Sequence, residues 1–150
     1  MQIWVDADAC PKAIKEILYR AASRTRTLVT LVANRPLHTP RTPFVKAVRV
    51  AHGFDVADHE ITKRVRPGDL VVTADIPLAA DVLEQGGFAL SPRGRRFTEE
   101  NIQESLAVRE IADQLRSAGV PTGGPPPLGK GDRQAFAGEL DRLLAARRQG

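Results

Sequence analysis

The chain has 150 residues, of which 42% are hydrophobic, 27% charged and 5% aromatic, and its formal net charge at pH 7 is +4. This length and composition predict a single domain with an aliphatic core. The protein is expected to be soluble and cytoplasmic, because no apolar run is long enough for a membrane span and an aspartate at position 6 interrupts any signal peptide. The single cysteine, Cys10, excludes an internal disulfide, and with only three histidines a zinc site is disfavoured.

Strand and helix patterns alternate through the first two thirds of the chain. The first strand begins at Ile3 and ends where two carboxylates, Asp6 and Asp8, follow its apolar run. Pro11 suits the first position of a helix that runs to about residue 23, and prolines at 36, 40 and 43 exclude regular structure from a later loop. Further strands are predicted over 27–33, 45–51, 70–74 and 88–91, and further helices over 58–65 and 77–83.

The last third has a helical pattern. Thr98 is predicted to cap a long helix that ends near residue 117. Nine of the thirteen residues in 119–131 are Gly or Pro, which predicts a hinge or an ordered loop, and Asp132 is predicted to cap a final amphipathic helix. We therefore divide one domain, 1–150, into an α/β core (1–97), a long helix (98–118), a Gly/Pro-rich loop (119–131) and a C-terminal helix (132–148).

Aspartates follow two of the predicted strands. Asp6 and Asp8 end the first strand, and Asp75 follows the fourth. The carboxyl ends of parallel strands meet at one edge of a sheet, so these acids are expected to converge there. Oxygen ligands of this kind suit Mg²⁺ or Mn²⁺, which can polarise a phosphoryl oxygen and generate a hydroxide nucleophile. We predict Asp6, Asp8 and Asp75 as catalytic residues and metal ligands.

Purely structural roles are also open to these acids and their neighbours. Asp8 and Asp75 could each cap the helix that follows. Thr73 shares a face with Asp75 and could support the site by a hydrogen bond, or reflect strand propensity alone. Asp81 could add a metal ligand or face solvent, and Asp69 is expected to be a turn residue.

Basic residues occur in four clusters, which suits a polyanionic partner such as nucleic acid but equally a solvated surface. The clusters are Arg20/Arg24/Arg26, Lys63/Arg64/Arg66, Arg93/Arg95/Arg96 and Arg147/Arg148. The third cluster follows the fifth predicted strand, so Arg93, Arg95 and Arg96 are expected near the aspartates as contacts for nucleic-acid phosphates.

Several short segments have specific sequences that can be compared with known families. They are Val5-Asp6-Ala7-Asp8-Ala9-Cys10-Pro11, Gly53-Phe54-Asp55-Val56-Ala57-Asp58, Gly68-Asp69, Thr73-Ala74-Asp75-Ile76-Pro77-Leu78-Ala79, Ser91-Pro92-Arg93-Gly94, Gly123-Gly124-Pro125 and Asp132-Arg133. These segments resemble the YaiI/YqxD family of uncharacterised bacterial proteins. The resemblance covers nearly the whole chain. That family in turn resembles the PIN/NYN-like nucleases, which use acids after the first and fourth strands to hold Mg²⁺ or Mn²⁺ for RNA cleavage.

The resemblance implies a three-layer, PIN-like (Rossmannoid) α/β fold with a mainly parallel sheet and a helical C-terminal extension. It also implies an Mg/Mn-dependent ribonuclease, with Asp6 and Asp75 as the matching acids and Asp8 and Asp81 as additional ones. Three residues, Asp55, Asp58 and Glu60, are alternatives for the mid-chain acid of PIN domains. The position of Asp132-Arg133 suggests that the Gly/Pro-rich segment folds back toward the main body.

Three alternatives stay open. A haloacid-dehalogenase-like phosphatase would use Asp6 as nucleophile and Asp8 as acid and base, although Cys10 stands where that superfamily usually has Thr or Val. A non-catalytic RNA-binding protein would use the acids as helix caps, but it would have few aromatic side chains on which bases could stack. A nucleophilic role for Cys10 would profit from the start of the helix that follows it, but the sequence does not place His38, His52 or His59 near this thiol. Neither of two common nucleotide-binding glycine motifs is present.

Overall fold

The computed structural model describes residues 1–124 and 126–149. Two residues singled out in the sequence analysis lie outside the described part: Pro125, and Arg148 as far as its side chain is concerned. The strands are β1 (Ile3–Asp6), β2 (Val29–Ala33), β3 (Val45–Arg49), β4 (Leu70–Val72), β5 (Phe88–Leu90) and β6 (Arg96–Phe97). The helices are α1 (Lys12–Thr25), α2 (Val56–Arg64), α3 (Ile76–Glu84), α4 (Glu99–Ser117) and α5 (Lys130–Gln149), and a short 3-10 turn, η1 (Ala7–Ala9), follows β1.

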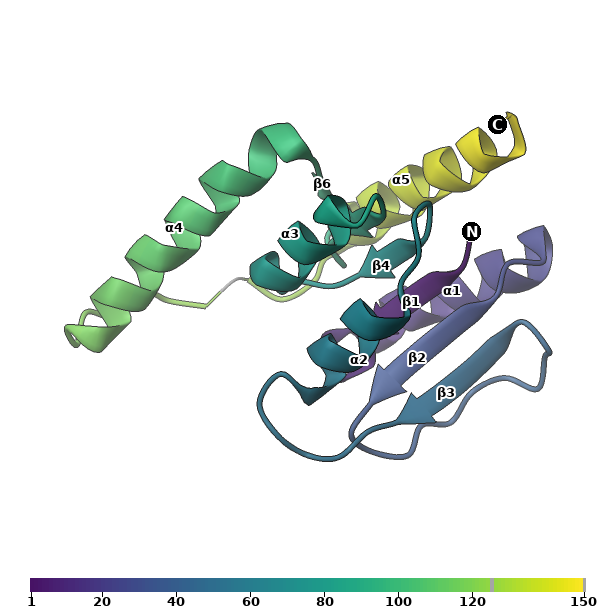
Figure 1. Cartoon of the computed structure of the whole chain (residues 1–150), viewed down its shortest axis with the longest axis horizontal. Coiled ribbons are helices and arrows are strands. Elements are labelled where there is room, and N and C mark those ends of the chain that lie inside the picture. The colour runs from purple at the N-terminus through teal and green to yellow at the C-terminus, as the bar shows by residue number, and fades with distance from the viewer. Residues whose placement is uncertain (125, 150) are drawn as a thin grey trace.

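The six strands form one mixed sheet in the order β3-β2-β1-β4-β5-β6 (Figure 1). Strands β1 to β5 are parallel, and only the terminal β6 pairs antiparallel, with β5. The chain moves outward from β1 to β3 on one side and from β4 to β6 on the other. This reversal of strand order between β1 and β4 is where open α/β sheets form ligand sites. The predicted α/β class with a mainly parallel sheet is confirmed.

Two helical layers cover the sheet because its strands are apolar on both faces. Ile3 and Val5 of β1 face a core shared with α1 and α5, and this core includes the fully buried Phe136. Trp4 points the other way, into a second core with Ile61 of α2, α3 and the start of α4. The alternation along β1 therefore sends Asp6, two residues after Trp4, to the α2 and α3 face.

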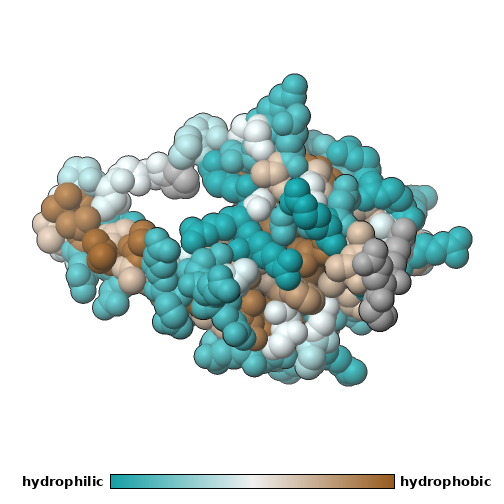
Figure 2. Space-filling model, turned by 90° about the horizontal axis from the view of Figure 1, so that it is seen from above, coloured by the Kyte–Doolittle hydropathy of each residue, from teal (hydrophilic) through white to brown (hydrophobic). Residues whose placement is uncertain are grey.

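Helix α4 extends away from the sheet (Figure 1). Its start is a capping box, in which the Thr98 hydroxyl accepts the Asn101 N–H and the Asn101 side-chain carbonyl accepts the Thr98 N–H, so the predicted cap is confirmed. Farther along, Val108, Ile111 and Leu115 are exposed, and brown atoms gather at this end of the molecule in Figure 2. Within the described residues no helix has the length and apolar character needed to cross a membrane.

Several predicted boundaries are wrong by a few residues. Strand β3 ends at Arg49 and not at residue 51, because it is an edge strand whose one partner, β2, ends at Ala33. Helix α2 begins at Val56 and not at residue 58, directly after Asp55, whose left-handed backbone (φ 61°) redirects the chain. Strand β6 is not predicted from the sequence, because a strand of two residues is too short to show the alternation of apolar and polar side chains.

The predicted cap of the last helix is also wrong. Helix α5 begins at Lys130, so Asp132 lies inside its first turn. Its carboxylate accepts the N–H of Gly129 (3.0 Å), a residue that precedes it, and pairs with Arg93 (2.9 Å). The Arg93 guanidinium also donates to the carbonyl of Pro126. These contacts hold the end of the Gly/Pro-rich segment against the turn between β5 and β6.

Candidate metal centre

The first component of the site is Asp6, the last residue of the central strand β1. It is half-buried, and the hydroxyl of Thr73, which follows β4, donates a hydrogen bond to its Oδ2 (3.1 Å). Strands β1 and β4 are neighbours in the sheet, with Val5 opposite Val72. The parallel pairing therefore brings together two residues that are 67 positions apart in the sequence.

Asp75 is held beside Asp6 by the turn that leads into α3. Its N–H donates to the Thr73 hydroxyl (3.0 Å), and its Oδ1 accepts the N–H of Leu78 (2.9 Å), so Asp75 caps α3. The expected capping role of Asp75 is thus confirmed. A cap uses one carboxylate oxygen for the helix N–H groups and leaves the second oxygen free for another ligand.

Two further aspartates come from the start of α2. Asp55 is the residue before the helix, makes no capping hydrogen bond, and is followed in the first turn by Asp58. Asp55, Asp58 and Asp75 each place a carboxylate oxygen within 4.8 Å of the others. Together with Asp6 and Asn34 they line a hollow of about 240 Å³ at the carboxyl edge of the sheet. We call Asp6, Asp55, Asp58 and Asp75 the aspartate cluster.

Mutual repulsion and burial disturb the ionisation of the cluster. Burial, repulsion by Asp75 and a hydrogen bond with Asp75 raise the pKa of Asp58 to about 7, and Asp6 and Asp55 add to the effect. Burial also raises the pKa of Asp6; the Thr73 hydroxyl opposes this shift, whereas the charges of Asp75 and Asp8 reinforce it. Within the described chain, the ion pairs between side chains include none of the four cluster acids.

The other predicted acids lie outside this cluster. Asp8, on η1, accepts the N–H of Asn34 (2.8 Å) and pairs with Arg35 (3.4 Å). It does not cap α1, since Pro11 occupies the cap position. Asp81 is exposed on α3, one turn and a half after the cap, and does not line the hollow.

The three residues considered for the mid-chain acid of PIN domains lie in different places. Asp55 and Asp58 both join the cluster, whereas Glu60 turns to Arg64 (2.7 Å) and Lys63 (3.8 Å) on the same helix. The sequence contains a signal for this result, because two aspartates three residues apart at a helix start share a side of its first turn. Asn34, which follows β2 and also lines the hollow, is not among the residues predicted from the sequence.

The three predicted phosphate contacts have partners within the protein. Arg93 pairs with Asp132, as described above. The guanidinium of Arg95 lies 5.8 Å from the ring centre of Phe97, and that of Arg96 lies 5.1 Å from the ring centre of Phe88. Both Arg95 and Arg96 are exposed, and the Nη1 of Arg96 is 4.0 Å from the Glu139 carboxylate.

Asp69, expected to be a turn residue, does more than shape a turn. It is 7% exposed, and its carboxylate accepts the N–H groups of Gln2 (2.9 Å) and Arg66 (3.0 Å) and the indole N–H of Trp4 (3.1 Å). It lies at the amino edge of the sheet, at the far end of β1 from Asp6. Asp69 therefore has no part in the aspartate cluster.

The chain is similar to known proteins over nearly its whole length. Residues 4–146 match a family described as uncharacterized, the YaiI/YqxD family. A UPF0178 protein of Halorhodospira halophila is 62% identical over 147 residues, which cover 98% of this chain and 97% of the relative. UPF0178 proteins of Yersinia pestis (strain Pestoides F) and Yersinia pseudotuberculosis (strain YPIII) are each 60% identical over 144 residues, which cover 96% of this chain and 95% of the relative. No solved structure matches significantly.

Proposed function

The chain belongs to the YaiI/YqxD family, and we propose that it is a divalent-metal-dependent nuclease that cleaves RNA at the aspartate cluster. One observation carries the proposal: Asp55 and Asp58, at the start of α2, and Asp75, at the start of α3, bring carboxylate oxygens within 4.8 Å of one another. The resemblance to PIN/NYN-like nucleases supports the same conclusion, because the acids after β1 and β4 are the ones that correspond.

The donor set fits Mg²⁺ or Mn²⁺. Carboxylate oxygens are the ligands that these hard ions prefer, and like charges so close together are unfavourable without a cation. We assign Asp6, Asp55, Asp58 and Asp75 as the groups that would hold the ion. When bound, the ion supplies Lewis acidity toward a phosphoryl oxygen of the substrate.

The protein's own groups have definable tasks. Thr73 fixes the orientation of Asp6 and Asp75 through the two hydrogen bonds described above. In the metal-free protein Asp58, with a pKa of about 7, is partly protonated at neutral pH, so binding of the ion there would release a proton. The exposed Arg95 is the cation we expect to contact RNA phosphates, since Arg93 is engaged with Asp132 and Arg96 lies beside Glu139.

The phosphatase alternative is less well supported. It needs Asp8 free to act as acid and base, yet this carboxylate already binds Asn34 and Arg35. Nucleophilic chemistry at Cys10 is also disfavoured, because burial raises the pKa of its thiol to about 12 and the thiolate is the reactive form. A non-catalytic RNA-binding protein remains as the outcome if the cluster binds no metal.

The test is a calorimetric titration of Mn²⁺ and Mg²⁺, followed by cleavage of labelled single-stranded RNA with and without a chelator. We expect Asp58→Asn and Asp75→Asn to weaken metal binding and abolish cleavage; asparagine retains the cap of α3. Asp81→Asn is the matched control, because it removes an equal charge from an exposed position on α3. Unchanged metal affinity in Asp75→Asn would overturn the proposal, and activity loss in Asp8→Asn alone would favour the phosphatase.

A further inference from the structure

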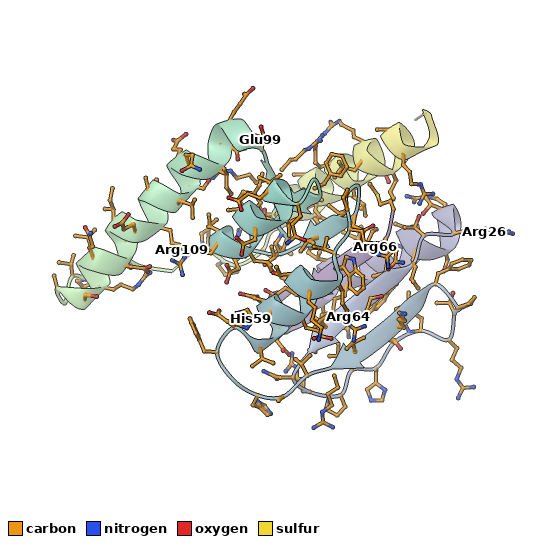
Figure 3. All side chains as sticks on the ribbon, viewed as in Figure 1. Arg26, His59, Arg64, Arg66, Glu99 and Arg109 are labelled. Atoms are coloured by element: carbon orange, nitrogen blue, oxygen red, sulfur yellow. The ribbon has the colours of Figure 1, made fainter. Side chains whose placement is uncertain are left out.

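A second hollow lies at the opposite end of β1 from Asp6, at the amino edge of the sheet. It has a volume of about 590 Å³, with Trp4 and Asp69 among its lining residues. Its other lining side chains include four cations, Lys46, Lys63, Arg64 and Arg66. Figure 3 labels Arg64, the last residue of α2, and Arg66, which follows it. We call this hollow the basic groove.

The basic groove has an excess of positive charge. Glu60 pairs with both Lys63 and Arg64, and the buried Asp69 carboxylate is satisfied by three N–H donors. Lys46 and Arg66 are exposed, and neither forms an ion pair with a carboxylate in the described chain. Two cationic side chains thus converge on one hollow with their charges available to an anion.

The buried carboxylate of Asp69 supports the shape of the basic groove. It accepts the backbone N–H of Arg66 and the indole N–H of Trp4, so one carboxylate fixes the positions of two residues that line the groove. A fully hydrogen-bonded, buried carboxylate is a rigid support, because breaking any of its bonds leaves a charge unsatisfied. Lys46 comes from a different element, the edge strand β3. The cations therefore belong to a preformed surface and are not scattered along one helix.

The strand register also places groove residues in one row. Lys46 lies opposite Thr30 in the β2–β3 register, and Thr30 lies opposite Trp4 in the β1–β2 register. Residues in register on neighbouring strands point to the same face of a sheet, so Lys46 and Trp4 share the face that α2 covers. Thr30, between them, is fully buried and does not line the groove.

We propose that the basic groove binds backbone phosphates of the RNA strand that the aspartate cluster cleaves, an inference that rests on the proposed function. Helix α2 links the two sites, with Asp58 in its first turn and Arg64 at its end. Its nine residues span about 13 Å, which a few nucleotides of a strand can bridge. Because Trp4 is 6% exposed, it offers no stacking surface, so binding here is independent of base sequence.

The experiment measures the affinity of the full chain for a labelled single-stranded RNA in EDTA, over a range of salt concentrations. We expect Lys46→Gln/Arg66→Gln to weaken binding by about tenfold and to reduce the slope of log K against log salt by about 1.4, the value for two phosphate contacts. Arg20→Gln/Arg41→Gln is the control with an equal charge change, since both arginines are exposed and form no ion pair in the described chain. Thermal unfolding verifies that both variants fold.

The outcomes separate this inference from the proposed function. If the two double variants weakened RNA binding equally, or if the parent bound no RNA in EDTA, the proposal that the basic groove binds RNA would be overturned. A third result would also overturn the RNA proposal. If the parent bound inorganic phosphate tightly and the groove variant lost this binding while its RNA affinity stayed unchanged, the groove would bind a small phosphorylated ligand instead. RNA binding that depends on the groove in a protein that binds no metal would refute the nuclease and leave the groove intact.

Discussion

Thr73 hydrogen-bonds Asp6 through its hydroxyl proton (3.1 Å) and, through the same oxygen, accepts the N–H of Asp75 (3.0 Å). One side chain therefore connects the ends of the two central strands, β1 and β4, where the strand order reverses. The threonine is 1% exposed, so neither hydrogen bond can be replaced freely by water. The two acids that the family resemblance singles out are linked by this contact.

Replacement of Thr73 by valine tests this link. We expect Thr73→Val to lower the free energy of unfolding by about 1–3 kcal/mol, because Asp6 and the Asp75 N–H both lose a partner, and to weaken Mn²⁺ binding. Urea denaturation and calorimetry measure the two effects. Thr30→Val is the control, since the Thr30 hydroxyl is buried without a partner; this variant should be as stable as the parent or more so. Equal destabilisation by both variants would contradict the assigned role.

The stability of the metal-free protein should depend on pH through Asp58. Its carboxyl ionises near its ordinary pKa of 3.8 when unfolded but near 7 when folded, so the folded state binds more protons between these values. The free energy of unfolding should therefore fall as pH rises from about 4 to about 7.

Urea denaturation at pH 5 and pH 8 measures this change. Asp58→Asn should reduce the difference, because asparagine does not titrate, and saturating Mn²⁺ should protect the parent most at pH 8, where the ligands are deprotonated. A variant with the same pH dependence as the parent would show that Asp58 is not the group responsible.

Loss of the buried Asp69 carboxylate should damage the amino edge of the sheet. Asp69→Ala leaves the indole N–H of Trp4 and two backbone N–H groups without their acceptor, so we expect a loss of about 3 kcal/mol or more. Asp69→Asn retains one acceptor oxygen and should lose less. Because Trp4 is the only tryptophan, its fluorescence reports the local change directly. Metal binding at the distant aspartate cluster should persist in any variant that remains folded.

A pair of glycines tests how closely α5 packs against the turn between β5 and β6. Gly94 has a φ of +86°, and a Cβ there would lie 2.5 Å from the backbone carbon of Ala135. Gly94→Ala should therefore cost about 3 kcal/mol, measured by thermal unfolding. Gly138→Ala, on an open part of α5, should instead stabilise the protein by about 0.5–1 kcal/mol, because alanine is the better helix former. A tolerated Gly94→Ala would contradict this close packing.

Local patterns predict much of the fold. Apolar runs ending in carboxylates identify β1 and β4, and Thr98 and Asp75 are expected at the positions where they cap α4 and α3. These features depend on neighbouring residues, so they can be read from the sequence. The two-residue β6 cannot, because it exists only through its pairing with β5.

The candidate site, like the fold, could be predicted from the sequence only in part. The sequence by itself determined that Asp6 and Asp75 would meet, because both follow strands of a parallel sheet. Only the tertiary structure decided that Asp55 and Asp58 join them while Glu60 pairs with Arg64, since this depends on the angle at which α2 leaves Asp55. Likewise, Lys46 and Arg66 share a groove only because β3 and the end of α2 pack at the same edge of the sheet. Convergence of side chains from separate elements depends on packing geometry, which local sequence does not encode.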